Sequence, residues 1–320
     1  MSADVICLRP EADFLEVGVL PPTGLAITYA EPSLVPPQDL ATARAVVLAS
    51  VGPRLERGWL DKIPDLELVQ FTGAGVDRAG DACAHRPDVI VAGIPAANAR
   101  EVAEYVLFAA GALLRGLAFA DRGIRAGQYA GTRARLTPRY ARSLHSRTAG
   151  VVGLGQIGLA VARLLRAAGA SVCYADPAPR DTSLGLDRLS LDDLLARCDL
   201  VTLHVPLLPS TRGMLGEPQL RRMPPGALLI NASRGGVVDE EALARVLIDG
   251  HLAGAAVDVY QTEPPAADSP LLTLPPPVAD RLLFTPHIAG VAYEAARSLY
   301  TKAWDNVSRI LNGQKGAGSR

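Results

Sequence analysis

Apolar residues occur along the first hundred residues in short bursts that polar or proline-rich segments separate. The bursts are VICL (5–8), AITYA (26–30), AVVLAS (45–50), ELVQF (67–71) and VIVAG (89–93). Short apolar runs bounded by turn-forming residues are typical of buried strands. The helices between them are weakly marked, and the pattern as a whole predicts a small parallel α/β domain.

A longer apolar pattern follows, from about residue 98 to residue 117, and predicts a long helix. Its most apolar part, YVLFAAGALL (105–114), lies between Glu104 and Arg115 and is too short to span a bilayer. We expect it to be a buried helix. The next stretch (122–147) is rich in arginine and glycine and has no clear periodicity, so we expect a connecting loop region there.

The pattern is sharper after residue 149, where strand-like runs alternate with helix-like segments. Six strands are expected, at 149–154, 170–175, 199–205, 227–232, 253–260 and 281–284, and a proline-rich link (264–277) joins the last two. Alternating strands and helices predict a parallel sheet with helices on both faces. Six strands is the count of a complete dinucleotide-binding fold.

The composition is that of a globular protein without a strong charge bias. The 320 residues are 49% hydrophobic and 20% charged, with a formal net charge of −1, and this length favours two domains. Without a basic surplus, nucleic-acid binding is not expected. The N-terminus does not resemble a secretory signal, and no membrane partner is expected. The four cysteines lack metal-ligand spacing, so we expect no metal site and a reducing cytoplasm.

The first strand after residue 149 runs into the motif GLGQIG, which contains Gly153, Gly155 and Gly158. Such a motif alone is a weak signal in a chain with 30 glycines, but here an apolar strand precedes it and an amphipathic helix follows. Gly153 allows the tight turn, Gly155 lets a pyrophosphate approach the backbone and Gly158 permits close helix packing. The helix N-terminus, at Gln156 and Ile157, offers free N–H groups and a positive dipole end to phosphates.

Asp176 ends the second of these strands, about twenty residues beyond the glycines, where an acid is expected to hold the adenine-ribose hydroxyls. The alternative is a tight turn with a solvent-facing Asp176 before Pro177. Strand, glycines, helix and acid together favour binding of a nicotinamide dinucleotide. Arg180 is the nearest arginine, and we expect the intervening prolines to aim it elsewhere, so NAD(H) is predicted over NADP(H).

Candidate ligand-binding and catalytic residues follow the later strands. This is the expected place for them, because ligands of an open parallel sheet bind beyond the carboxyl ends of its strands. These residues are His204, Pro206, Arg234, Asp258, Glu263 and His287. Arg234 would hold a substrate carboxylate with two parallel hydrogen bonds. His287 would exchange the proton of a hydroxyl–carbonyl pair, and Glu263 would pair with His287. The alternatives are a surface salt bridge, a satisfied histidine and a solvated loop acid, but the joint placement favours a catalytic site.

Several motifs together resemble the D-isomer-specific 2-hydroxyacid dehydrogenase family. They are GLGQIG, HVPLLPSTRGML, INASRGGVVDEEAL, AAVDVYQTEP and FTPHIAG, within 149–290, and two weaker ones, FTGAGVDR (71–78) and NAREVAEYVL (98–107). The resemblance implies two doubly wound parallel-sheet domains. A Rossmann NAD-binding domain (98–290) would be inserted into a split, flavodoxin-like substrate-binding domain (1–97 and 291–320).

The resemblance also implies roles for particular residues. Arg234, Glu263 and His287 would be the catalytic trio. Backbone amides of one loop would bind the substrate carboxylate, those of Gly73, Ala74, Gly75 and Val76. Four residues would line the adenine and nicotinamide ends of the cofactor: His204, Pro206, Ala232 and Asp258. The family commonly forms homodimers through the cofactor domain, and the helix at 98–117 is a candidate for part of that contact.

The sequence departs from the family pattern at positions that leave the substrate open. Tyr105 stands where many members have a histidine, and Pro95-Ala96 replaces a Pro-Gly pair. The loop 125–142 carries Tyr129 and Tyr140 but lacks the tryptophan often seen there.

The predicted function is the NAD-dependent interconversion of a small 2-keto acid and its D-2-hydroxy acid, with glyoxylate and hydroxypyruvate reduction preferred. One alternative is a dinucleotide-sensing, corepressor-like binding protein, and another is a dehydrogenase of a non-carboxylate such as phosphite. The related formate dehydrogenases pair the histidine with a glutamine, which Glu263 argues against. The extra regulatory domain of longer phosphoglycerate dehydrogenases is not expected after residue 312.

Overall fold

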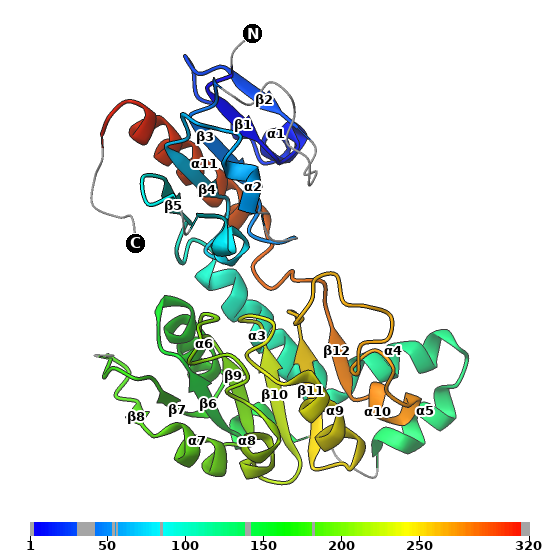
Figure 1. Cartoon of the computed structure of the whole chain (residues 1–320). Coiled ribbons are helices and arrows are strands. Elements are labelled where there is room, and N and C mark those ends of the chain that lie inside the picture. Colours follow the sequence, from blue (N-terminus) through cyan, green and yellow to red (C-terminus); the bar gives the residue numbers. More distant parts are fainter. Residues whose placement is uncertain are drawn as a thin grey trace. The chain divides into compact units, whose positions relative to one another are not determined.

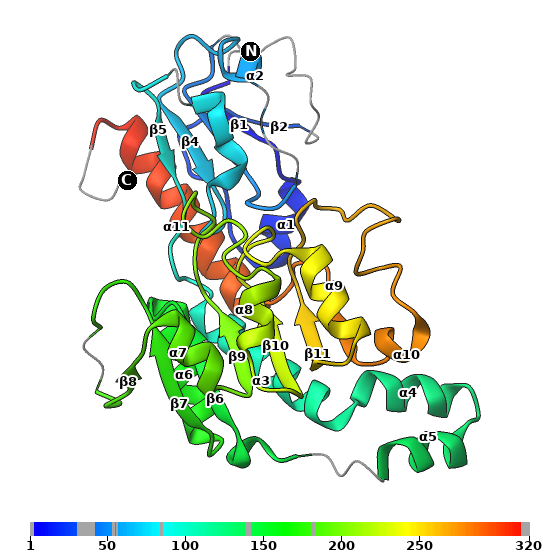
Figure 2. The same cartoon turned by 60° about the horizontal axis from the view of Figure 1, so that its bottom comes forward.

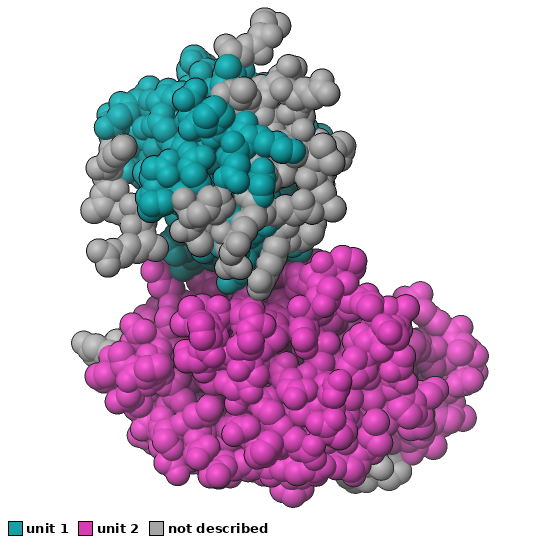
Figure 3. Space-filling view, viewed as in Figure 1, with its two compact units in different colours: residues 1–98, 291–320 teal, residues 99–290 magenta. Residues whose placement is uncertain are grey.

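The computed structural model describes residues 3–30, 42–52, 55, 57–83, 86–137, 142–180 and 183–314. The chain divides into two compact units, residues 1–98 with 291–320 (unit 1) and residues 99–290 (unit 2), which Figure 3 shows in teal and magenta. Each unit is built on its own parallel sheet (Figure 1). The predicted fold class, two parallel-sheet α/β domains, is confirmed.

The sheet of unit 1 has five parallel strands in the order β2-β1-β3-β4-β5. They are β1 (Val5–Cys7), β2 (Ile27–Tyr29), β3 (Ala45–Leu48), β4 (Leu68–Phe71) and β5 (Ile90–Ala92). Each lies inside one of the five apolar bursts of the sequence. The order is that of flavodoxin-like folds.

Unit 1 is completed by a helix from the end of the chain. Its helices are α1 (Glu11–Glu16), α2 (Arg57–Leu60), the 3₁₀ helix η2 (Asp77–Cys83) and α11 (Tyr293–Leu311). In Figure 1, α11 lies along the sheet, and its side chains share a core with α1. The ring of Phe14 in α1 is centred 4.7 Å from the ring of Tyr300 and 5.1 Å from that of Trp304. Aromatic packing therefore attaches α11 to α1.

The sheet of unit 2 has seven parallel strands in the order β12-β11-β10-β9-β6-β7-β8. They are β6 (Thr148–Val152), β7 (Ser171–Ala175), β8 (Asp187–Arg188), β9 (Leu200–Leu203), β10 (Ala227–Asn231), β11 (Leu252–Val257) and β12 (Leu282–Phe284). The expected count of six strands was wrong because β8 has two residues, both exposed and polar, and shows no apolar pattern.

Helices cover both faces of the unit 2 sheet, as the alternating pattern predicts. On one face, α3 (Ala99–Arg115) and α6 (Gln156–Ala167) share a core with β6, β9 and β10. On the other face lie α7 (Leu191–Arg197), α8 (Glu217–Arg222) and α9 (Glu240–Ile248). The chain winds in opposite directions from β6, through β7 on one side and β9 on the other. Ligands of such sheets bind at this reversal of strand order.

The segment expected as a connecting loop at 122–147 is partly helical. It contains the last turn of α4 (Leu117–Arg125), all of α5 (Tyr129–Leu136) and the 3₁₀ helix η4 (Leu144–Ser146), while Tyr140 lies outside the described residues. The expectation failed because the two short helices are held by a tertiary contact: a side chain at Gly123 would collide with Thr132. Gly116, with a φ of 62°, separates α3 from α4. No described helix alone is long and apolar enough to cross a membrane, and α3 with α4 passes that test only as a pair bent by 63°.

Replacing Phe14 with alanine should destabilise unit 1 by about 3 to 5 kcal/mol, because it removes a fully buried ring from the contact between α1 and α11. Leu15→Ala is the matched control, since the neighbouring side chain is 49% exposed and should change stability by less than about 0.5 kcal/mol. Urea unfolding followed by circular dichroism measures both. Equal midpoints for the two variants would contradict this account of how α11 is attached.

Candidate active site

Parallel register brings the ends of the unit 2 strands into one row. In spatial order across the sheet, the successive register partners are Phe284, Val257, Asn231, Leu203, Val152 and Ala175. The residues that follow them are Gly153, Asp176, His204, Ala232, Asp258 and Thr285. All but Thr285 were predicted site residues. The carboxyl edge of this sheet therefore carries the candidate site.

The glycine loop connects β6 to α6 at this edge. Gly153 has a φ of 88°, and a side chain there would overlap the backbone of His204. A side chain at Gly158 would overlap the carbonyl of Gly153. At Gly155, by contrast, no described atom lies within 4 Å of the position of a β-carbon. Packing therefore requires Gly153 and Gly158, whereas Gly155 borders open space through which a phosphate can approach.

The N-terminus of α6 completes the phosphate-binding arrangement. Gly155 is the N-cap, and no described side chain caps the helix. The first N–H groups, including those of Gln156 and Ile157, are therefore left without a side-chain partner at the positive end of the helix dipole. These residues fit the pyrophosphate of a dinucleotide.

Asp176 directly follows β7 and is held against the glycine loop. Its carboxylate accepts hydrogen bonds from the amides of Leu154 (2.9 Å) and Ala178 (3.0 Å). Arg180 Nε lies 3.3 Å from Asp176 Oδ1, so the expectation that the prolines would aim this arginine elsewhere was wrong. Burial opposes ionisation, but the amides and Arg180 lower the pKa of Asp176 below its ordinary value. The acid is thus an ionised carboxylate whose charge Arg180 partly offsets.

Glu263 and His287 form a hydrogen-bonded pair at the same edge. Glu263 Oε2 lies 2.9 Å from His287 Nδ1, and Glu263 Oε1 accepts the amide of Tyr260 at 3.1 Å. About three quarters of each of the two paired side chains is buried. Burial alone would raise the pKa of Glu263, but the hydrogen bond and charge of His287, the Tyr260 amide and the charge of Arg234 lower it overall. The carboxylate is therefore ready to orient the imidazole.

Arg234 belongs to the turn after β10. Asn231 Nδ2 donates to the carbonyl oxygen of Arg234 at 3.2 Å, and Arg234 Nη1 donates to the carbonyl oxygen of Ser233 at 2.7 Å. A side chain at Gly235 would overlap the carbonyl of Tyr260. This close approach places the Arg234 turn against the segment that leads to Glu263. The structure thus brings all three residues of the predicted trio to one part of unit 2.

His287 lies in a turn with unusual backbone geometry. Its φ is 56°, a conformation that residues other than glycine rarely adopt. The His287 amide donates to the carbonyl oxygen of Asp258 at 2.8 Å. The Asp258 carboxylate accepts the amides of Ile288 (2.8 Å) and Ala289 (2.9 Å). Strained conformations held in this way are concentrated at functional sites.

The other predicted cofactor contacts differ in their surroundings. Burial lowers the pKa of His204 to about 3, so its imidazole is neutral. His204 Nε2 lies 2.9 Å from Thr202 Oγ1, and its buried Nδ1 has no hydrogen-bond partner among the described residues. An unsatisfied buried nitrogen at this edge fits contact with a ligand. Ala232 is half-buried, and Pro206 is exposed.

The predicted carboxylate-binding loop belongs to unit 1. Gly73, Ala74, Gly75 and Val76 follow β4, and the carbonyl oxygen of Gly73 accepts the amide of Ile94 at 2.8 Å. Ala74 and Val76 are exposed. The loop thus lies at the carboxyl end of a strand in the other unit, and its part in substrate binding stays a prediction. Among the described residues, no group of three or more His, Cys, Asp or Glu side chains could hold a metal ion.

Two residues of the site were not predicted from the sequence. Arg180 pairs with Asp176, and Thr285 donates a hydrogen bond to Asp258 Oδ1 at 2.6 Å. Arg180 follows Asp176 by four residues, and this spacing alone is a weak indication that the two side chains form an ion pair. For Thr285 the only signal is its position at the end of a predicted strand, because its partner lies 27 residues away.

Comparison with known proteins gives a matching family and several similar proteins. Residues 107–289 match the family described as D-isomer specific 2-hydroxyacid dehydrogenase, NAD binding domain. An (S)-sulfolactate dehydrogenase of Chromohalobacter salexigens is 38% identical over 85% of this chain and 85% of that protein. A D-3-phosphoglycerate dehydrogenase of Mycobacterium leprae is 36% identical over 78% of this chain, but the match covers only 46% of that protein. The chain thus spans about half the length of the curated phosphoglycerate dehydrogenases it matches.

A solved structure extends the similarity to both units. The D-lactate dehydrogenase of Aquifex aeolicus, complexed with NAD and lactic acid, has a TM-score of 0.83 and is 28% identical over 97% of this chain and 96% of that one. The chain belongs to the D-isomer specific 2-hydroxyacid dehydrogenase family, which confirms the resemblance seen in its motifs. Residues 107–289 are the NAD binding domain of that family, and the predicted cofactor, NAD, is confirmed.

Replacing Arg180 with alanine should strengthen the preference for NADH over NADPH. Without Arg180, the charge of Asp176 would repel the 2′-phosphate of NADPH more strongly. Coenzyme fluorescence measures the dissociation constants of NADPH and NADH. We expect the Kd for NADPH divided by the Kd for NADH to rise about tenfold, equivalent to about 1.4 kcal/mol. Arg197→Ala is the control, because this exposed arginine pairs with Asp187 instead. If Arg180→Ala leaves the ratio unchanged, the ion pair does not influence coenzyme choice.

Proposed function

We propose that this chain is an NAD-dependent dehydrogenase that interconverts a small 2-keto acid and its D-2-hydroxy acid. The observation that carries the proposal is the 2.9 Å pair between Glu263 and His287, in the unit that also contains Arg234 and the glycine loop. An acid–base group, a carboxylate ligand and a dinucleotide site are the three requirements of this reaction. Family membership supports the same assignment.

His287 is the proposed proton donor and acceptor. Its Nδ1 faces Glu263, which leaves Nε2 to face a substrate oxygen. Glu263 fixes the orientation of the ring, as a carboxylate commonly does for a catalytic histidine. In the reductive direction Nε2 gives its proton to the oxygen that becomes the hydroxyl group, and in the oxidative direction it takes that proton back. Bound NADH would supply the hydride for the reduction.

Arg234 is the proposed ligand of the substrate carboxylate. A guanidinium group can hold a carboxylate through two parallel hydrogen bonds, which sets both position and angle. The carbonyl of Arg234 is held by Asn231, so the turn that carries the side chain has a defined shape. The amides of the loop from Gly73 to Val76 in unit 1 are the predicted further donors to that carboxylate.

The substrate is proposed as a class, with individual acids to be tested. Glyoxylate and hydroxypyruvate are the first candidates, and the names of the two relatives add the 2-keto forms of sulfolactate and 3-phosphoglycerate. The test is a panel of these acids, pyruvate and phenylpyruvate with NADH, monitored by NADH absorbance. Turnover of at least one acid is expected. Tight NADH binding without turnover of any of them would contradict the proposal and favour a dinucleotide sensor.

Replacing His287 with asparagine should lower kcat by roughly 10²- to 10⁴-fold, because the proton donor is lost. NADH should still bind, since the glycine loop and Asp176 are unchanged. His251→Asn is the matched control in the same unit: His251 contacts the carbonyl of Met223 and lies outside the site. Steady-state kinetics with the best acid of the panel, together with NADH titration, measures both effects. Near-normal kcat for His287→Asn would remove this residue from the mechanism.

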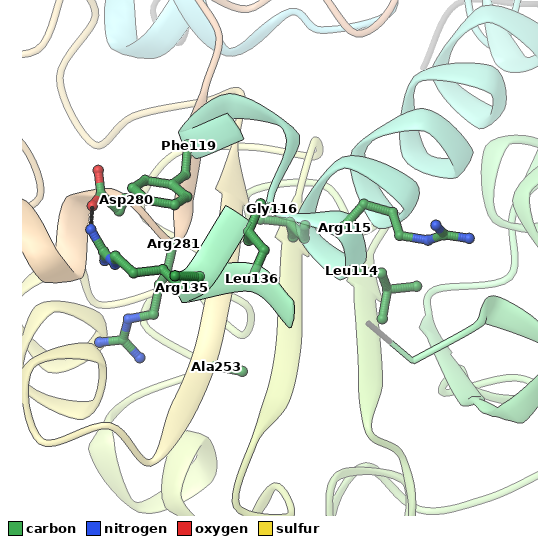
Figure 4. A pocket seen from close by; sticks show the side chains of 11 residues that line it. Leu114, Arg115, Gly116, Phe119, Arg135, Leu136, Ala253, Asp280 and Arg281 are labelled. Atoms are coloured by element: carbon green, nitrogen blue, oxygen red, sulfur yellow. Dashed lines mark hydrogen bonds and ion pairs between the residues drawn. The ribbon is translucent and has the colours of Figure 1, made fainter. Parts of the chain in front are cut away.

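We further propose that the chain forms a homodimer through the helices α3 to α5 of unit 2. In Figures 1 and 2, α4 and α5 extend from the side of the sheet where β12 lies. Phe108, Leu117 and Ile124 on these helices are more than half exposed. Other residues of the same helices, among them Leu114, Phe119 and Leu136, line a hollow of about 490 Å³. Its lining also includes Arg115, Arg281 and Arg135, which contacts Asp280 (Figure 4). Exposed apolar side chains next to a hollow are typical of a surface that another protein covers.

The double variant Phe108→Asp, Ile124→Asp should be a monomer, because two charges would be buried without partners in the proposed contact. Light scattering coupled to size-exclusion chromatography should give the wild type twice the mass of the 33.6 kDa chain. Leu20→Asp alters an exposed apolar residue of unit 1 and should leave the dimer intact. A monomeric wild type, or a dimeric double variant, would refute this surface.

A further inference from the structure

A row of hydrogen-bonded groups connects α3 with the turn that carries His287. The hydroxyl of Tyr105, in α3, lies 2.6 Å from Thr285 Oγ1. Thr285 Oγ1 in turn donates to Asp258 Oδ1 at 2.6 Å. All three residues belong to unit 2. Tyr105 is 180 residues from Thr285 in the sequence, so only the folded chain brings them together.

The direction of these hydrogen bonds follows from the groups themselves. The threonine hydroxyl has one proton, and that proton points to Asp258. Thr285 Oγ1 must therefore accept the proton of Tyr105. Burial raises the pKa of Tyr105 to about 12, so the phenol remains a donor throughout the neutral range. The row thus has one polarity, from Tyr105 through Thr285 to the carboxylate.

Asp258 transmits this arrangement to the catalytic turn. Its side chain is fully buried, and its two oxygens accept the amides of Ile288 and Ala289. Its carbonyl oxygen accepts the amide of His287 at 2.8 Å. The left-handed conformation of His287 is costly and persists only where surrounding contacts enforce it. The orientation of the Asp258 carboxylate is therefore one of the constraints on that turn.

Thr285 is also held from a second side. The hydroxyl of Tyr260 shares its one proton between the carbonyl oxygens of Thr285 (3.1 Å) and Val257 (3.2 Å). The Thr285 amide donates to the carbonyl oxygen of Val257 at 3.1 Å. With its backbone fixed, the hydroxyl of Thr285 has a defined position between Tyr105 and Asp258. Loss of the Tyr105 hydroxyl would therefore leave the partly buried Oγ1 of Thr285 with one donor fewer.

We propose that Tyr105 is a positioning residue for His287. Through Thr285 it orients the Asp258 carboxylate, which holds the turn that presents the imidazole to Glu263. The inference rests on the proposed function for its effect on catalysis, but its structural effect can be measured without turnover.

The test compares Tyr105→Phe, Thr285→Val and the double variant with the wild type. Each single variant should lower kcat about tenfold with an unchanged KM for NADH, since a small displacement of a catalytic group suffices for such a loss. Because Tyr105 acts through Thr285, the double variant should be no slower than Thr285→Val. Tyr293→Phe, which removes an exposed hydroxyl from unit 1, is the control and should match the wild type.

Hydrogen exchange of the protein without substrate provides the second readout. In Tyr105→Phe, the amides of Ile288 and Ala289 should exchange about tenfold faster, because their acceptor is less firmly held. If Tyr105→Phe changes neither the exchange rates nor kcat, Tyr105 has only a packing role and the inference is overturned, even if the melting temperature falls. Additive losses of kcat in the double variant would also overturn it. A wild type that turns over no acid of the panel refutes the proposed function, and the exchange rates then decide the inference alone.

Discussion

The parallel register of the unit 2 sheet is the constraint on which the candidate site depends. Hydrogen bonding between neighbouring strands aligns Val152, Leu203, Asn231 and Val257 in one row. Because parallel strands all point the same way, the residues that follow this row emerge at one edge. The glycine turn, an acid and the loop that carries His287 are far apart in the sequence, and the register makes them neighbours at this edge.

Close backbone contacts set the distances between the loops that follow the aligned strand ends. Gly153 packs against the backbone of His204, and Gly235 packs against the carbonyl of Tyr260. No larger residue fits at either place, so each glycine sets the distance between two loops of the site. The hydrogen bonds of Asp258 then hold His287 in a conformation that an isolated chain would rarely adopt. Rigid loops on a rigid sheet are what a reaction between two bound molecules requires.

Charges at the edge act through their immediate partners. Asp176 is ionised and held by two amides, but Arg180 pairs with it and weakens the simple expectation that an acid here repels a 2′-phosphate. Glu263 is likewise kept ionised by His287 and Arg234 despite its burial. The sign of a side chain's charge predicts which ligand group it attracts, and the neighbouring charges and hydrogen bonds determine how strong that attraction is.

The sequence by itself determined the described strands other than β8, the glycine loop and the family, because local periodicity and short motifs report which residues are buried and which backbone positions must lack a side chain. It also identified five of the six residues that follow the register row, since a strand end is a local feature. Only the tertiary structure decided that Arg180 turns back to Asp176, that Gly123 packs on Thr132 between two unexpected helices, and that Tyr105 reaches Asp258 through Thr285. These contacts join side chains whose directions depend on loop shape and on segments up to 180 residues apart, and no pattern of hydrophobic and polar positions records such directions.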